Sequence, residues 1–190
     1  MNYIETLKAR RSFYSLGKQE NFNQEDIKTL IEEVVELTPD AFNMQSARVV
    51  ILFGEKSEAF WDKVNHTFDD KLDPTKLKGF KGGNGTVLFF TDKKTVEDMG
   101  NQFPLYKENF AIFASHAMGM VQGNVWNALR TKNLGASLQH YNPVIDTWVK
   151  EDYNLSEAWQ LTAQMPFGAI LADEPEKEKR PKSERVKVIN

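Results

Sequence analysis

The chain has 190 residues, of which 41% are hydrophobic and 27% charged, enough for one globular domain with a sizeable core. Its formal net charge of -3 gives no basic field for nucleic acid or an anionic membrane, and the lack of cysteine excludes disulfides and thiolate chemistry. The apolar runs fall short of the roughly 18 residues of a membrane span, and Met1–Glu5 lacks a secretory signal pattern. We therefore expect a cytoplasmic protein.

Helices dominate the first third of the chain. Tyr3–Arg10 is predicted to form the first, and a second begins after Asn23, a good cap followed by acidic residues that suit the helix dipole. The sequence Thr38-Pro39-Asp40 ends the second helix. The apolar run Val49–Phe53 is typical of a buried strand. A third helix is predicted over Ser57–Asp70.

The middle of the chain contains the longest helical pattern. Lys76–Gly85 is rich in lysine and glycine and is expected to be a loop before a second strand, Thr86–Phe90. Phe110–Leu129 is apolar or small nearly all round, which indicates a helix buried on most sides, at the centre of the fold or at a subunit interface.

The last third alternates short elements and ends in a charged arm. We expect a short strand, two helices and a third strand over Leu134–Leu138, Val144–Lys150, Ser156–Thr162 and Met165–Leu171. Gly168 inside the last strand implies close approach of another backbone or a ligand. Beyond it, residues 173–184 are predicted to be exposed. The alternating Val186–Ile189 is either a frayed end or a strand that docks on a sheet of this chain or of a partner.

Four polar segments stand out between the apolar ones. Arg10-Arg11-Ser12 follows a helix, where two guanidiniums and a hydroxyl either bind a phosphate or complement the helix end. Lys177-Glu178-Lys179-Arg180 is either a second anion contact or a solvated run. Asn43-Met44-Gln45-Ser46 is either a turn or a hydrogen-bonding edge for a heterocycle. Gly135–Pro143 offers small residues, then amide, imidazole and phenol groups.

Other chemistries find no support in the pattern. The three histidines show no metal-ligand spacing, so we expect no metal site. There is no glycine-rich phosphate loop of the Rossmann or Walker kind and no nucleophile elbow. The basic runs lack the aromatic interleaving expected of a nucleic-acid surface.

The order of these segments over the whole chain resembles the FMN-dependent nitroreductases, and more closely their fatty-acid-repression-mutant-like subgroup (the Frm2/Hbn1 type). The resemblance rests on Arg10-Arg11-Ser12, the Asn43-x-Gln45 loop before a strand, the long central helix, Leu134-Gly135-Ala136 and the terminal basic arm. It implies an α+β fold with a mixed sheet flanked by helices. It also implies a single domain over residues 1–190 that forms an intertwined homodimer, with residues 173–190 packing on the partner subunit.

The same resemblance assigns cofactor residues. The arginine pair and Ser12 would hold the FMN phosphate and ribityl chain, the terminal arm would close over the phosphate, and the Asn43 loop would approach the flavin from the neighbouring subunit. The segment 139–142 would lie along the isoalloxazine, with a backbone N–H near Tyr141 or Asn142 directed at N5. The complete cofactor set is Arg10, Arg11, Ser12, Asn43, Gln45, Ser46, Lys78, Gln139, His140, Tyr141, Asn142, Lys177, Lys179 and Arg180.

Three features depart from the family pattern. Tyr14 stands where many members have a basic residue that would stabilise the anionic reduced flavin; Lys78 or Lys81 is expected to substitute for it. Ser46-Ala47 follows Gln45 where Pro-Trp is familiar, which would open space for other substrates. The chain also lacks an evident helical insertion over the substrate side. The last two features fit the subgroup.

The resemblance implies an NAD(P)H-dependent flavin enzyme that reduces nitroaromatics, quinones or similar electron-poor small molecules by ping-pong hydride transfer, with no catalytic side chain. One alternative is an FMN-binding redox or regulatory module with little turnover, which Tyr14 favours. Another is a flavin-free helical interaction protein whose basic clusters lie on the surface. Unchanged flavin content in both Arg11→Ala and Lys177→Ala would remove the phosphate argument.

Overall fold

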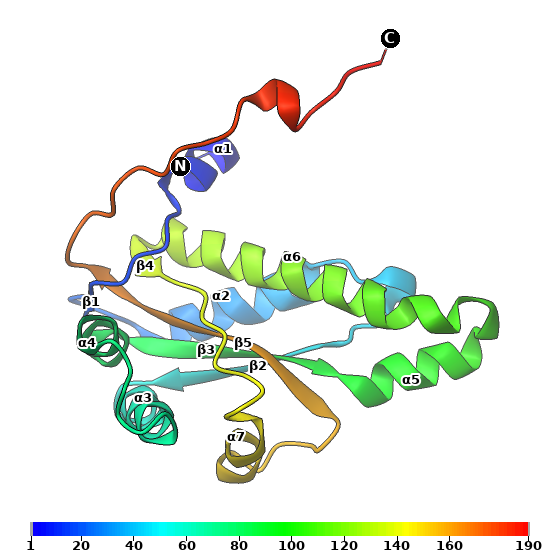
Figure 1. Ribbon diagram of the computed structural model, residues 1–190, viewed down its shortest axis with the longest axis horizontal. Helices are drawn as coiled ribbons and strands as arrows, with labels where there is room; N and C mark the ends of the chain where they lie inside the picture. Colours follow the sequence, from blue (N-terminus) through cyan, green and yellow to red (C-terminus); the bar gives the residue numbers. More distant parts are fainter. Residues whose placement is uncertain (1, 190) are drawn as a thin grey trace.

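The computed structural model describes residues 2–189 and shows one antiparallel sheet with helices on both faces (Figure 1). The strand order is β1-β5-β3-β2, and β4 pairs with β5 off this path. The bounds of the strands are β1 Leu16–Gly17, β2 Ala47–Phe53, β3 Gly85–Asp92, β4 Leu134–Ala136 and β5 Trp159–Ile170. A parallel bridge between Ser12 and Ala136 makes the sheet mixed at one edge.

Seven α-helices surround this sheet within residues 2–189. They are α1 Tyr3–Ala9, α2 Gln24–Leu37, α3 Glu55–Thr67, α4 Pro74–Gly82, α5 Lys93–Gln102, α6 Phe110–Thr131 and α7 Asp146–Asp152, with 3-10 turns at Ala41–Asn43, Pro104–Asn109 and Lys182–Glu184. Polar caps begin several of them: Asn23 accepts the Glu25 N–H at 3.0 Å, and Asp73 accepts that of Thr75 at 2.8 Å. No helix in the described part of the chain is long and apolar enough to cross a membrane.

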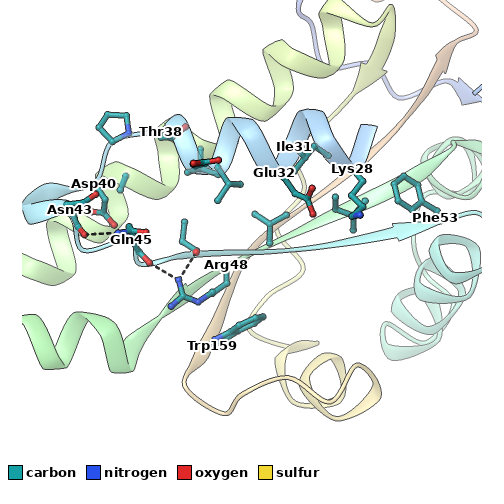
Figure 2. A pocket seen from close by; sticks show the side chains of 18 residues that line it. Lys28, Ile31, Glu32, Thr38, Asp40, Asn43, Gln45, Arg48, Phe53 and Trp159 are labelled. Atoms are coloured by element: carbon teal, nitrogen blue, oxygen red, sulfur yellow. Dashed lines mark hydrogen bonds between the residues drawn. The ribbon is translucent and has the colours of Figure 1, made fainter. Parts of the chain in front are cut away.

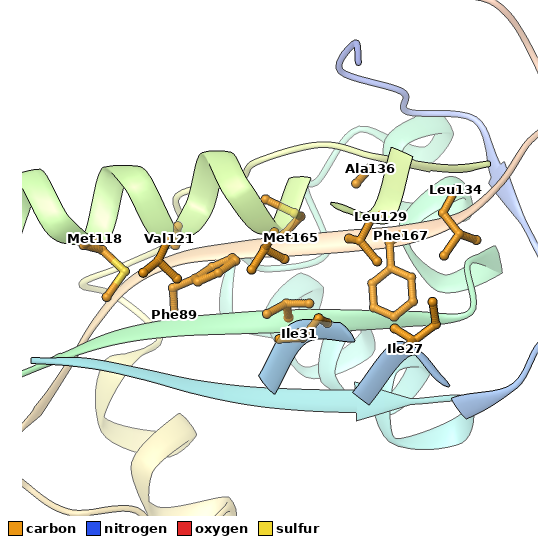
Figure 3. Packing of buried hydrophobic residues seen from close by; sticks show 13 residues of the cluster. Ile27, Ile31, Phe89, Met118, Val121, Leu129, Leu134, Ala136, Met165 and Phe167 are labelled. Carbon is orange, nitrogen blue, oxygen red and sulfur yellow. The ribbon is translucent and has the colours of Figure 1, made fainter. Parts of the chain in front are cut away.

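The central strand β3 is buried on both faces and separates two cores. Val87 and Phe89 point towards α2 and α6, together with Met165 and Phe167 of β5 (Figure 3). Leu88 and Phe90 point to the other side, which α3, α4 and α7 cover with large aromatic residues. Because side chains alternate along a strand, a strand covered on both faces is apolar throughout, as this one is.

Helix α6 packs one side on the sheet and leaves the other uncovered. Phe110, Ala117, Val121 and Leu129 are buried as predicted, and Phe113 packs at the margin of the core. Ile112 and Met120, however, are 53% and 42% exposed. A Cβ added at Gly119 or Gly123 would meet nothing within 4 Å. The sequence of α6 predicts burial on most sides, but a single chain buries only about half of the helix surface.

Two sequence predictions about local structure are wrong. The expected loop over Lys76–Gly85 is mostly helix α4, which Asp73 caps and Pro74 begins. Its Gly79 is needed because a side chain there would overlap the Tyr14 carbonyl. The expected helix over Ser156–Thr162 is instead a turn followed from Trp159 by the start of β5, where Trp159 pairs with Asp92.

The chain end is exposed, and one helix was not foreseen. Val186–Ile189 forms no strand within the described chain; it is exposed and projects away from the sheet (Figure 1). Helix α5 was not predicted, although Asp92 caps it by accepting the Lys94 N–H at 3.0 Å. The remaining predicted elements are present with small shifts of their ends. The close approach expected at Gly168 is confirmed, since a Cβ there would overlap the backbones of Gly17 and Gly83.

Candidate functional site

The arginine pair lies where α1 ends against the last turns of α6. The Arg10 guanidinium stacks over the Trp126 ring, 4.5 Å from its centroid, and Arg130 donates to the Ala9 carbonyl at 3.1 Å. Burial lowers the pKa of Arg10, and the positive charge of Arg11 lowers it further. Within residues 2–189 no carboxylate forms an ion pair with either arginine. Two neighbouring cations without a carboxylate partner favour an anion at this position.

The arm that follows β5 contacts this cluster at its start. Arg11 donates to the Pro175 carbonyl, and the Glu174 carboxylate accepts the Tyr14 N–H at 3.2 Å. Figure 1 shows the arm passing beside α1. Lys177 is two residues beyond Pro175, which places it within about 7 Å of chain length from that contact. Lys179 and Arg180 are exposed further along the arm.

Ser12 connects the cluster to the polar segment after β4. The bridge from Ser12 to Ala136 and the bond from the Phe13 N–H to the Ala136 carbonyl, at 2.9 Å, hold the two stretches side by side. The Trp126 indole N–H also donates to Ala136, at 3.2 Å. Trp126, which supports Arg10, therefore also holds the end of β4, the strand that leads into the Gln139–Asn142 segment.

The Gln139–Asn142 segment is tied to β5 by one residue, Gln164. Gln139 and Gln164 exchange two backbone hydrogen bonds of 2.7 and 2.9 Å. The Gln164 side-chain carbonyl accepts the Tyr141 N–H at 2.8 Å, and its amide nitrogen donates to Asn142 Oδ1 at 3.2 Å. His140 is exposed. Sequence analysis did not identify Gln164.

The Tyr141 ring contributes to packing instead of facing a ligand. It packs edge-on against Trp61 and Phe68 in the core beneath α3, with ring centroids 5.7 and 5.5 Å away. Burial raises the pKa of its phenol, and Asp73 raises it further. The contribution of Tyr141 to this segment is therefore its backbone.

A lysine that the sequence did not single out lies beside Tyr14. The Lys76 ammonium lies 5.3 Å from the centroid of the Tyr14 ring. Lys81 is bonded to Asp62, whereas Lys78 is exposed on α4 with no ion pair in the described structure. Helix α4 brings Lys76 to this place, and the loop predicted for this region concealed that position.

Asn43 and Gln45 lie in a different region, at the end of α2. Both are exposed with positive φ, of 51° each, a conformation that asparagine adopts more readily than most residues. Ser46 is buried, and Asp40 accepts its hydroxyl at 2.7 Å and its N–H at 2.8 Å, so Ser46 shapes the loop from within. Asn43 and Gln45 line a cavity of about 650 Å³ between α2 and β2 (Figure 2).

The two polar regions are at opposite ends of α6. The Asn43 loop is at its start, where the rings of Phe42 and Phe110 are 5.3 Å apart, whereas Arg10 stacks on Trp126. Positions 110 and 126 are separated by 16 residues of helix, or about 24 Å. One chain therefore does not bring Asn43 and Gln45 to the arginine cluster.

Comparison with known proteins identifies the family. The nitroreductase family model matches residues 7–169. The chain belongs to the nitroreductase family. Two proteins of Saccharomyces cerevisiae, putative nitroreductase HBN1 and nitroreductase FRM2, are 35% and 33% identical over 92% and 93% of this chain and 91% and 92% of their own. The resemblance inferred from the ordered motifs is thereby confirmed.

Solved nitroreductases confirm the α+β fold class. Nitroreductase CinD of Lactococcus lactis, solved in complex with chloramphenicol or 4-nitrophenol, has a TM-score of 0.93 and 38% identity over 100% of both chains. A putative nitroreductase from Exiguobacterium sibiricum in complex with FMN has a TM-score of 0.77 over 100% of this chain and 98% of its own. At 12% identity, this second likeness concerns the fold alone.

Proposed function

We propose that this nitroreductase is an FMN-dependent NAD(P)H oxidoreductase that reduces nitroaromatics, quinones or similar electron-poor acceptors. The observation that carries the proposal is the connection between an anion site and a hydrogen-bonding segment. Arg10 and Arg11 have no carboxylate partner in residues 2–189, and Ser12 is bridged to the strand that leads into Gln139–Asn142. A ligand with a phosphate group joined to a polar ring system would fit both the arginine cluster and the Gln139–Asn142 segment.

The donor set fits FMN. Arg10, Arg11 and Ser12 would hold the phosphate, because guanidinium forks match phosphate oxygens, and Lys177 would approach from the arm together with Lys179 or Arg180. Gln139, His140 and Asn142 would lie along the ring, and Lys78 or Lys76 would border it from α4. When bound, FMN accepts hydride from a reduced nicotinamide and passes electrons to the acceptor.

The residues of this chain bind and orient; we assign none of them as a catalytic acid or base. The protein's part in flavin chemistry is placement and electrostatic tuning. Lys76, poised beside Tyr14, brings positive charge to the place where Tyr14 replaces the usual cation. The acceptor class follows the complex of CinD with 4-nitrophenol, a nitroaromatic compound.

We also propose that the functional unit is a homodimer. Asn43 and Gln45 are about 24 Å from the arginine cluster along α6, so they can border the same ligand only from a second copy. The exposed face of α6, with Ile112, Met120 and room above Gly119, suits close packing of two helices.

The terminal arm fits the same assembly. Strand β2 pairs only with β3 in residues 2–189, so its outer edge is available, and apolar side chains line the cavity between β2 and α2. The alternating Val186–Ile189 segment is exposed in its own chain and would add to that edge in the partner.

The first experiment is an absorbance spectrum of the purified protein. Yellow protein that bleaches under anaerobic NADH or NADPH is expected. Colourless protein that cannot be reconstituted with FMN would contradict the proposal.

A mixing experiment tests the two-chain site. An Arg10→Ala chain and an Asn43→Ala/Gln45→Ala chain should each bind FMN weakly as homodimers. A mixed dimer holds one site with all native residues and should bind one FMN per dimer with native affinity. If mixing restores no binding, the site does not draw on two chains.

A slower flavoprotein is the second candidate, and Tyr14 favours it, because an uncharged ring occupies the position of a cation. Reduction and reoxidation that take minutes would identify an FMN-binding redox or regulatory module. Turnover in seconds with a nitroaromatic acceptor would identify the enzyme.

A further inference from the structure

Gln164 is a polar residue in an apolar position. Its side chain is fully buried on β5, opposite Leu88 of β3, in a sheet whose other buried side chains are mostly aliphatic or aromatic. A methionine or leucine would fit the hydrophobic pattern there. An amide buried at such a place is costly unless both ends are bonded. Both ends are bonded, and both partners belong to the segment 139–142.

These bonds orient the amides one after another. The Tyr141 N–H can only donate, so the Gln164 oxygen must face it at 2.8 Å and the Gln164 nitrogen must face Asn142. That nitrogen donates to Asn142 Oδ1 at 3.2 Å, which turns the Asn142 Nδ2 group away from Gln164. One buried residue thereby sets the direction of the next side chain's donors.

The outcome is a pair of available donors at Asn142. The Tyr141 N–H is used by Gln164, whereas in residues 2–189 the Asn142 N–H and Nδ2 have no hydrogen-bond acceptor. Asn142 also lines a cavity of about 580 Å³ between α5, α6 and β5, so it is accessible. Two donors on one residue suit a ring nitrogen next to a carbonyl oxygen.

We propose that Gln164 is a positioning residue that holds Asn142 so that its N–H meets flavin N5 and its side-chain amide meets the adjacent carbonyl oxygen at C4. This inference rests on the proposed function. It assigns the N5 donor to Asn142 and excludes Tyr141, whose N–H is taken. Gln164 does not touch the reacting atoms; it acts through the segment that it anchors.

The test compares two Gln164 variants reconstituted with FMN labelled with ¹⁵N at N5 and ¹³C at C4. Gln164→Met keeps the length but loses both side-chain bonds. It should shift both resonances and slow flavin reduction by NAD(P)H about tenfold. The Kd for FMN should stay within about threefold of the wild-type value, because the residues that hold the phosphate are intact. With its carboxylate ionised, Gln164→Glu keeps the acceptor for Tyr141 but turns the Asn142 amide round, so it should shift the C4 resonance and leave N5 near its native position.

Thr86→Val is the matched control. Thr86 is fully buried on β3 and bonds Trp61 and Ser57 at 2.8 and 2.7 Å, so the variant also loses two buried hydrogen bonds, but none to the segment 139–142. It should unfold at a lower urea concentration with native resonances and a native reduction rate.

Native resonances in FMN-loaded Gln164→Met, or shifts of equal size in Thr86→Val, would overturn the inference. If Gln164→Met does not fold, an unchanged C4 resonance in Gln164→Glu overturns it equally. Failure of the wild-type protein to bind FMN would instead overturn the proposed function, so the two failures are distinguishable.

Discussion

Lys63 and Arg10 both lie over tryptophan rings in the described chain, and their surroundings differ. Lys63 of α3 lies 4.7 Å from the Trp148 ring centroid, and its ammonium is bonded to Asp152 at 2.6 Å. Arg10 lies 4.5 Å from the Trp126 ring, next to Arg11 instead of a carboxylate. The first cation is neutralised within the fold and joins α3 to α7. The second is left with a like charge beside it, which costs free energy unless an anion binds.

The largest expected effect separates these two cations by their role in flavin binding. If Arg10 binds the FMN phosphate as proposed, Arg10→Ala removes charge-assisted hydrogen bonds worth about 1.5–3 kcal/mol, so the Kd for FMN should rise roughly 10- to 100-fold. Lys63→Ala removes the stacked cation that Asp152 neutralises and should change that Kd by less than about twofold. Fluorescence titration of apoprotein with FMN measures both. Equal losses in the two variants would show that stacked cations matter only for general stability.

A smaller effect is expected from inorganic phosphate alone. If the Arg10 cluster binds the phosphate group, phosphate at about ten times its Kd should stabilise the apoprotein by about 1.4 kcal/mol, or roughly 3–5 °C in Tm. The shift should be present in Lys63→Ala and absent in Arg10→Ala, with chloride at equal ionic strength as the control. A shift of the same size in all three proteins would indicate a nonspecific salt effect.

An element could be predicted from the sequence when the residues that determine it lie within the same stretch of chain. Asn23 and the apolar spacing after it predicted α2 because cap and pattern belong to the same stretch. Asp73-Pro74 is an equally good start for α4, but the glycines that follow favour a loop. Gly79 is there because the helix packs on the Tyr14 backbone, a contact between distant residues. The start of β5 was misassigned for a related reason: its strand character depends on pairing with Thr91 and Asp92.

The candidate site residues also differ in whether neighbouring residues or distant contacts reveal them. Arg10, Arg11 and Ser12 are adjacent in sequence, so their shared chemistry was visible. Lys76 could not be linked to Tyr14 without knowing that α4 packs there. Gln164 carried a weak signal, as a single amide within the otherwise apolar run Ala163–Phe167, but its partners are 22 and 23 residues away.

Removing the neutralising carboxylate tests whether a stacked cation alone makes an anion site. Asp152→Ala leaves Lys63 over Trp148 without its ion pair, whose two side chains are 43% and 40% exposed. Such a pair contributes at most about 1 kcal/mol, so the free energy of unfolding should fall by up to that amount. The variant should gain no additional stabilisation from phosphate, because a lone ammonium lacks the second guanidinium and the hydroxyl. An added phosphate-dependent rise in its Tm would contradict this.

The smallest expected effect is the pH response of Tyr153, which follows Asp152 and lines a small cavity with Lys63 and Trp148. Burial, with a further contribution from the Asp152 charge, raises the pKa of this phenol from 10.0 to about 12. Between these values the unfolded chain loses the proton that the folded chain keeps, so the free energy of unfolding falls as pH rises above 10. Because the ring is partly exposed, the loss by pH 11 should be about 0.5 kcal/mol. Tyr153→Phe should show a smaller decline in urea unfolding at pH 8, 9.5 and 11, because the raised phenol pKa of Tyr141 remains. Tyr106→Phe, a control on the other side of the sheet, should decline as the wild type does. Identical pH slopes in wild type and Tyr153→Phe would show that the phenol is as well solvated in the folded chain as in the unfolded one, and that the region around Lys63 is less closed than its ion pair and packing indicate.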